Sequence, residues 1–139
     1  MNQHERLLRR LMYLNGLVLL LASPAVCLPS LTMTGWHEWL GLGVFPDSRI
    51  TIYLARSTAL LYAVHGAVTF YVAWKWKLFR ELVPLLAGLH VLIGLTLIGI
   101  DWTTAMPAYW TLLEGGPIAC FGLFLLWLYR KSDLPANPC

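Results

Sequence analysis

Charged residues are scarce in this sequence. They make up 12% of the 139 residues, whereas soluble domains usually carry about 25%. The ten basic and seven acidic residues leave a net charge of +3, and the basic residues lie beside apolar runs rather than in a dense patch of the kind that binds a phosphate backbone. The low charge therefore excludes nucleic acid as an expected partner and indicates that the lipid bilayer, not water, is the main solvent.

Cysteine is also scarce, and the three cysteines, Cys27, Cys120 and Cys139, are far apart in the sequence. This spacing excludes a zinc-binding or thiol-redox motif of the CxxC kind. We interpret Cys27 and Cys120 as small apolar packing residues and Cys139 as part of an exposed tail. The sequence also lacks a phosphate-binding loop and a serine placed beside a histidine for nucleophilic catalysis. These absences favour a non-enzymatic protein without a metal site.

Apolar residues dominate what remains. They make up 58% of the chain, and four stretches approach the roughly 20 apolar residues that a helix needs to cross a bilayer. These stretches are 8–28, 50–74, 82–100 and 107–129. They predict an all-α integral membrane protein, a four-transmembrane-helix bundle that forms a single membrane domain over residues 1–139. The first stretch also resembles a secretory signal, with a small-residue cleavage site at Ser23-Pro24-Ala25, but we expect it to be retained as a span.

Basic residues predict the orientation of these spans. Eight of the ten precede the first span, lie between the second and third, or follow the fourth: Arg6, Arg9, Arg10, Lys75, Lys77, Arg80, Arg130 and Lys131. Because positively charged loops stay in the cytoplasm, both termini are predicted to be cytoplasmic, in a bacterial cytoplasmic (inner) membrane. Tryptophans mark the two interfaces of the bilayer, with Trp74, Trp76 and Trp127 on the cytoplasmic side and Trp36, Trp39, Trp102 and Trp110 on the other.

The longest connection is the periplasmic loop over residues 29–49. Its tryptophans and leucines predict a short interfacial helix that begins near Thr34, a residue type suited to capping a helix. This helix is interpreted as a membrane-surface anchor or, alternatively, as a lid or a docking surface for a partner. Asp47 or Ser48 is expected to cap the second span.

The fourth span contains the sequence Gly115-Gly116-Pro117. Proline inside a helix removes one backbone hydrogen bond and clashes with the preceding turn, so a kink is predicted near Glu114. The sequence Pro135-Ala136-Asn137-Pro138 predicts an exposed tail.

Five ionisable residues are expected at membrane depth, within the second to fourth spans or directly at their ends: Arg56, His65, His90, Asp101 and Glu114. Such residues usually face the protein interior. Counting from the turn near residue 78 places His65 and His90 at nearly the same depth. At about 100° per residue, His90 and Asp101 share a face of the third span with Ala87 and Gly94.

Two faces of the second span differ in chemistry. The face of Arg56 carries alanines four residues apart, a spacing that lets two helix backbones approach closely, and it predicts a packing seam: Ala59, Ala63 and Ala67. The face of His65 forms a polar stripe: Thr58, Tyr62 and Thr69.

The polar intramembrane cluster of Arg56, Asp101 and Glu114 has two interpretations. The leading one is a buried structural ion pair, with Glu114 as the partner of Arg56 and Asp101 as the second choice. The alternative is a proton relay or a pocket for a small molecule.

The two histidines also have two interpretations. As axial ligands, His65 and His90 would bind a b-type haem from both sides, beside Tyr62 and with Gly94 making room for the ring. As neutral side chains, each would form a hydrogen bond with Tyr62, Thr69 or a backbone carbonyl, and no cofactor is then expected. We favour the second, because helices packed about 8–10 Å apart leave little space for a porphyrin.

Several stretches from residue 50 onward form a pattern. They are Tyr53-Leu54-Ala55-Arg56-Ser57, Ala59-Leu60-Leu61-Tyr62, Gly99-Ile100-Asp101, Ala105-Met106-Pro107 and Tyr109-Trp110-Thr111-Leu112-Leu113-Glu114-Gly115-Gly116-Pro117. Together they resemble an uncharacterised family of small bacterial four-helix membrane proteins, DoxX-like in topology, with a long loop after the first helix. The resemblance covers roughly two thirds of the chain and implies the fold rather than an activity. The thiol or respiratory chemistry associated with DoxX-like proteins is not expected, because paired cysteines are missing.

The sequence therefore favours a non-enzymatic accessory or scaffolding subunit of a membrane complex, associated with other membrane subunits or with further copies of itself. One alternative is an electron-transfer subunit that carries a b-type haem on His65 and His90. The other is a small-molecule binder or transporter with a polar pocket at Arg56, Asp101 and Glu114.

Overall fold

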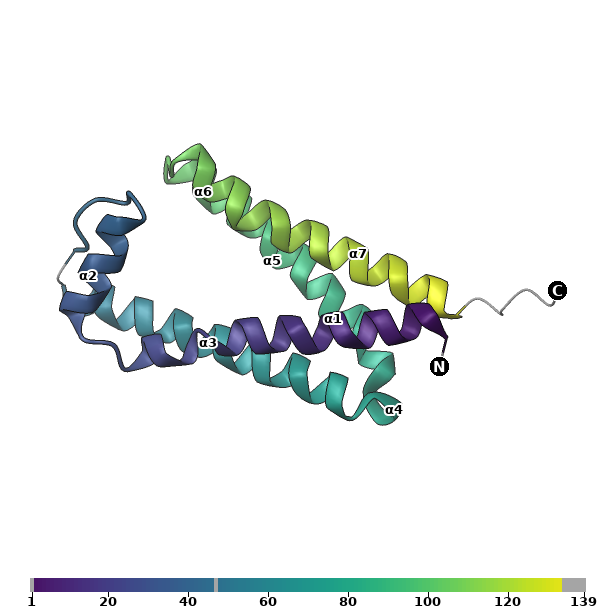
Figure 1. Ribbon diagram of the computed structural model, residues 1–139. Coiled ribbons are helices and arrows are strands. Elements are labelled where there is room, and N and C mark those ends of the chain that lie inside the picture. Colours follow the sequence, from purple (N-terminus) through teal and green to yellow (C-terminus); the bar gives the residue numbers. More distant parts are fainter. Residues whose placement is uncertain (1, 47, 134–139) are drawn as a thin grey trace. The chain divides into compact units, whose positions relative to one another are not determined.

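A computed structural model describes residues 2–46 and 48–133, and helices account for most of them, with no strand among these residues (Figure 1). The chain divides into two compact units. The first comprises the chain up to Met12 and again from Val72 onward, and the second is Tyr13–Tyr71. The predicted tail and Cys139 lie outside the described residues. The all-α prediction is confirmed.

The helical elements follow one another with short connections. They are α1 (Gln3–Leu20), η1 (Ser23–Val26), α2 (Ser30–Trp39), α3 (Arg49–Trp74), α4 (Trp76–Phe79), η2 (Arg80–Leu82), α5 (Val83–Thr103), α6 (Ala108–Leu113) and α7 (Gly115–Asp133). Within the described ranges, three helical segments are long and apolar enough to cross a membrane: Gln3–Val26, Trp76–Thr103 and Ala108–Ser132. The remaining long helix, α3, agrees with the predicted second span in its bounds, but its arginines, histidine and threonines lower its hydropathy.

Prolines determine where three of the helices end. Helices α1, α5 and α6 end at Leu20, Thr103 and Leu113. Each of these residues lies four positions before a proline, at Pro24, Pro107 and Pro117. Because proline has no N–H to donate to the carbonyl four residues earlier and its ring clashes with that carbonyl, the carbonyl of each end residue cannot accept the usual helical hydrogen bond. The kink predicted near Glu114 lies at the expected place and is a break between two helices, since α6 ends immediately before this residue and α7 begins immediately after it.

Two helix starts are set by polar side chains. Asn2 caps α1, because its Oδ1 accepts a hydrogen bond from the Glu5 amide at 2.8 Å, and the first span therefore begins earlier than predicted. Ser48 caps α3, since its Oγ accepts from the Thr51 amide at 3.1 Å. The capping prediction is confirmed for Ser48, while Asp47 lies outside the described residues.

Helix α2 corrects one prediction. It begins at Ser30, not near Thr34, because Pro29 is the N-cap and its carbonyl already accepts a hydrogen bond from the Met33 amide at 3.2 Å. Thr34 lies inside the helix and donates its hydroxyl to the Ser30 carbonyl at 3.1 Å. The helix ends where Gly41 takes a positive φ of 74°, a conformation that glycine adopts without strain.

Small residues bring α5 and α7 into backbone contact within the first unit, where Figure 1 shows the two helices side by side. A Cβ placed on Gly94 would lie 2.6 Å from the Gly115 carbonyl oxygen, and one placed on Gly122 would lie 2.6 Å from that of Ala87. Gly94 of α5 contacts Gly115 of α7, whereas Ala87, earlier on α5, contacts Gly122, later on α7. The two helices are therefore antiparallel. Close approach of this kind is typical of membrane helix pairs.

A second glycine contact joins α1 and α3 within the second unit. A Cβ on Gly16 would lie 2.9 Å from the Gly66 carbonyl oxygen, and Tyr13 packs edge-on against Phe70 at 5.1 Å between ring centroids. Ala59 and Ala63 are buried as predicted. Ala67 is exposed, so its place in the predicted seam is wrong, because Gly66 occupies the helix crossing instead.

Candidate functional site

The predicted polar face of α5 is buried in the first unit. His90 and Asp101 are only 4% and 5% exposed, and Ala87 and Gly94 are buried on the same helix. The prediction that these four residues share one face is confirmed. The face packs on α7 through Gly94, where the backbone amide of Ala119 approaches most closely.

His90 bonds to its own helix. Its Nδ1 lies 2.8 Å from the Leu86 carbonyl oxygen, and because a carbonyl can only accept, Nδ1 carries the proton. The Phe121 ring packs edge-on against the imidazole at 5.7 Å between centroids. This is the bond to a backbone carbonyl that the second interpretation predicts. The expectation that Gly94 makes room for a haem ring is wrong, because α7 fills the space beside it.

Asp101 is the exceptional polar residue of this unit. Its Oδ2 is buried, and no hydrogen-bond donor among the described residues reaches that atom. Its backbone carbonyl accepts from the Met106 amide at 3.0 Å, which closes the turn after α5. A buried acceptor without a donor costs about 1–3 kcal/mol, so this carboxyl group is a candidate binding group.

Glu114, at the junction of α6 and α7, is half-buried. Arg56 lies on α3 in the second unit, where it is exposed and donates to the Leu28 carbonyl at 3.1 Å. This bond ties α3 to the segment after η1. Because Arg56 belongs to the second unit and both carboxylates to the first, their ion pair stays a prediction.

The polar stripe of α3 differs from its prediction in part. Thr69 is fully buried, and its Oγ1 has no hydrogen-bond partner within the described ranges. His65 and Tyr62 are half-buried, whereas Thr58 is exposed. Since His65 lies in the second unit and His90 in the first, their joint ligation of a haem stays a prediction.

A polar network that the sequence did not predict joins three chain segments of the first unit. It consists of Glu5, Trp76, Arg80, Tyr129 and Ser132. Trp76 donates its indole N–H to Glu5 Oε1 at 2.8 Å, and Arg80 Nε lies 3.9 Å from the same oxygen. The Arg80 guanidinium lies 5.2 Å above the Tyr129 ring and donates to Ser132 Oγ at 3.2 Å. The sequence feature that could have indicated this network is Glu5, an acidic residue beside the N-terminal arginines.

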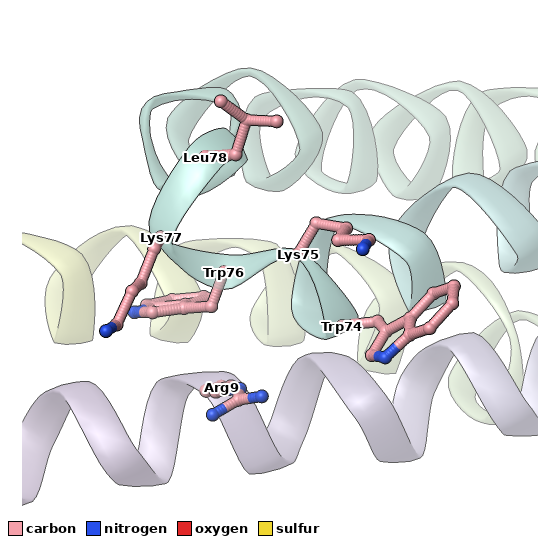
Figure 2. Close-up of a pocket in the computed structure, with 6 residues that line it drawn as sticks. All are labelled: Arg9, Trp74, Lys75, Trp76, Lys77 and Leu78. Atoms are coloured by element: carbon pink, nitrogen blue, oxygen red, sulfur yellow. The ribbon is translucent and has the colours of Figure 1, made fainter.

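An open groove of about 470 Å³ lies beside this network. It is lined by Arg9, Trp74, Lys75, Trp76, Lys77 and Leu78. Figure 2 shows Arg9 on α1 facing the turn formed by the other five residues. We call these six residues the cationic groove. The sequence predicted its tryptophans as interface residues but not that they gather around Arg9.

The two described cysteines correct a prediction. Cys27 and Cys120 are both exposed, so their interpretation as packing residues is wrong, because Ala119 rather than its neighbour Cys120 faces α5. Among the described residues, no group of three or more His, Cys, Asp or Glu side chains is arranged to hold a metal ion.

Comparisons with protein-family models, with curated proteins and with solved structures found no match. The DoxX-like resemblance therefore stays a prediction, and the functional argument rests on the polar and packing features described above.

Proposed function

We propose that this chain is a non-enzymatic accessory or scaffolding subunit of a bacterial cytoplasmic-membrane complex. The observation that carries the proposal is the separation of two kinds of side chain on opposite faces of α5 and α7. Their small residues and buried polar groups pack inward, while large apolar side chains face outward, among them Leu85, Leu92, Leu95, Leu123 and Phe124. Contiguous exposed apolar surface of this kind suits lipid or a neighbouring membrane helix.

The proposal includes α3 as a fourth span. Its 26 residues correspond to about 39 Å of helix at 1.5 Å per residue, which exceeds the roughly 30 Å of a hydrocarbon core. With four spans and the basic residues in alternate connections, both termini lie in the cytoplasm. The polar residues of α3 then lie at membrane depth, where such groups usually have a packing or binding role.

Single-cysteine labelling in intact cells tests this topology. In a chain whose native cysteines are replaced by serine, a membrane-impermeant maleimide should label a Thr103→Cys variant directly. It should label a Lys77→Cys variant only after the membrane is permeabilised. Direct labelling at position 77 would contradict the proposed orientation, and equal accessibility of both positions would contradict an odd number of crossings between them.

Photo-crosslinking in the native membrane tests the accessory role. A photoreactive amino acid at position 92, where the leucine is 61% exposed, should form a defined protein adduct, whereas the same group at position 90, where the histidine is 4% exposed, should form none. The adduct is identified by mass spectrometry. A chain that forms only lipid adducts from several outward positions of α5 and α7 is not a subunit of a complex.

A small-molecule or proton-binding role is the second candidate, because the buried Asp101 Oδ2 lacks a donor among the described residues. An Asp101→Asn variant, compared with Glu114→Gln, addresses this role in proteoliposomes with a pH-sensitive dye. If Asp101 binds a transported proton, the asparagine variant loses proton movement while its helical content stays unchanged. Equal proton movement in the wild-type protein, both variants and empty liposomes removes this candidate.

The haem alternative stays a prediction with a direct test. The imidazole of His90 is oriented by its bond to the Leu86 carbonyl, but the Gly94 side of the helix is filled, and the residues around His90 do not fit a ring there. A visible absorption spectrum of protein purified from haem-replete cells should show no Soret band. A stoichiometric Soret band that disappears in a His90→Ala variant would restore this alternative.

A further inference from the structure

The cationic groove has a charge of one sign. Three of its six lining residues, Arg9, Lys75 and Lys77, are cationic, and none of the described residues that line it is Asp or Glu. Lys75 and Lys77 are exposed, so their ammonium groups are accessible to a ligand. The groove therefore selects an anion by charge.

Two of these cations are held in place. Arg9 donates from Nε to the Ala73 carbonyl at 2.9 Å, which fixes the plane of its guanidinium at the end of α3. Lys75 Nζ lies 4.7 Å from the centroid of the Trp74 ring, a cation–π contact. Side chains that are already ordered lose little conformational freedom when they bind a ligand.

The groove also offers apolar surface. Trp74 is 57% exposed and Leu78 is 72% exposed, and both line the groove together with the two lysines. Tryptophan at the end of a membrane helix usually lies at the level of the lipid headgroups. A ligand that matches the whole groove therefore joins an anionic group to an apolar chain.

We infer that the cationic groove binds an anionic glycerophospholipid, with the headgroup phosphate among Arg9, Lys75 and Lys77 and an acyl chain along Trp74 and Leu78. Basic pockets at the ends of membrane helices recognise anionic headgroups through the same combination of charges. A soluble phosphate compound would leave the apolar wall unused. The inference requires only that the chain lies in a membrane, and it does not depend on the accessory role.

The experiment titrates the full-length chain in neutral detergent with dioctanoyl phosphatidylglycerol and measures the affinity by calorimetry. A Lys75→Gln/Lys77→Gln variant should bind about thirtyfold more weakly, since each basic residue near an anionic lipid contributes roughly a fivefold change in affinity. The matched control is Arg130→Gln/Lys131→Gln, which removes the same charge from exposed positions outside the groove. This control should bind within about twofold of the wild type. A Lys75→Arg/Lys77→Arg variant should keep most of the affinity.

Three results would overturn the inference. Equal weakening by the groove and control variants would show that only net charge matters. Equal binding of dioctanoyl phosphatidylcholine, a zwitterionic lipid, would show that the groove does not distinguish lipids by their net charge. Displacement of the lipid by inorganic phosphate at comparable concentration would assign the site to a free anion. Circular dichroism of each variant without lipid verifies the fold, and native mass spectrometry of lipid retained through purification provides a second readout of the same binding.

Discussion

Substitution of Gly94 by alanine should separate packing from helix propensity at the α5–α7 contact. A Cβ at this position would lie 2.6 Å from the Gly115 carbonyl oxygen and 2.8 Å from Ala119 Cβ, with the Ala119 amide nitrogen nearer still. Backbone atoms of a neighbouring helix cannot rotate away, so the helices must move apart. Overpacking of a tight contact typically destabilises a protein by about 1–3 kcal/mol.

The chain supplies a matched control for this prediction in Gly88. This residue lies on the same helix, but a Cβ added there would meet nothing within 4 Å. Both substitutions gain the same helix propensity, at most about 1 kcal/mol. The difference between Gly94→Ala and Gly88→Ala therefore reports packing alone, and we expect the Gly94 variant to be less stable by about 1–3 kcal/mol.

The assay is reversible unfolding of the purified protein in mixed micelles with increasing SDS, followed by far-UV circular dichroism and tryptophan fluorescence. A Gly94→Leu variant should be less stable again, since its side chain is larger. If Gly94→Ala and Gly88→Ala unfold with the same free energy, the backbone contact between α5 and α7 does not exist, and the antiparallel pairing derived from it must be abandoned.

Further substitutions probe the ends of the helices. Glu5→Ala should lower the free energy of unfolding by about 1–3 kcal/mol, because it leaves the indole N–H of the buried Trp76 without its acceptor. Glu5→Gln keeps an acceptor oxygen and should lower it by less than half as much. Equal losses for the two variants in the same SDS assay would contradict this role of Glu5. Ser48→Ala should cost about 1 kcal/mol by removing the cap of the Thr51 amide, and Ser48→Asp should restore it. Hydrogen exchange of the first turn of α3 that is unaffected by Ser48→Ala would contradict the cap.

The sequence predicted the helices better than their contacts. The helix ends four residues before Pro24 and Pro107 follow a local rule but were not predicted, and the first predicted span, 8–28, runs through Pro24 although α1 ends at Leu20. The cap at Ser48 and the break near Glu114 follow from local rules of the same kind. These features depend on neighbours in the chain, and one sequence suffices to find them.

The helix contacts required information that local rules do not contain. Gly16 and Gly66 lie where two helices cross, but a glycine in an apolar run is equally compatible with an exposed position, as Gly88 shows. The seam on α3 was predicted from alanine spacing and missed the crossing by one residue at Ala67. Neighbouring residues of a helix point about 100° apart. The spacing of small residues alone does not decide which of two neighbours faces the partner helix.

The candidate sites were likewise predicted only where they depend on local features of the sequence. Burial of Asp101 was predicted because a charged group in a span faces inward, and the structure confirms it. The bond between Glu5 and Trp76 spans 71 residues of sequence, and no periodicity links two residues so far apart. The cationic groove was missed for the same reason, since Arg9 lies 64 residues before Ala73, whose carbonyl it bonds at the edge of the groove.

The hydrogen bond between the Asn2 side chain and the Ser132 carbonyl spans 130 residues, at 3.0 Å. A chain that enters the bilayer while it is being synthesised cannot form this bond until almost every helix has left the ribosome. The contacts of Arg80 with Tyr129 and Ser132 also form late, because both partners lie on α7, which is synthesised after the other described helices. Glu5, its other partner in the network, has been made long before, so completion of α7 is the step that closes the network around Arg80.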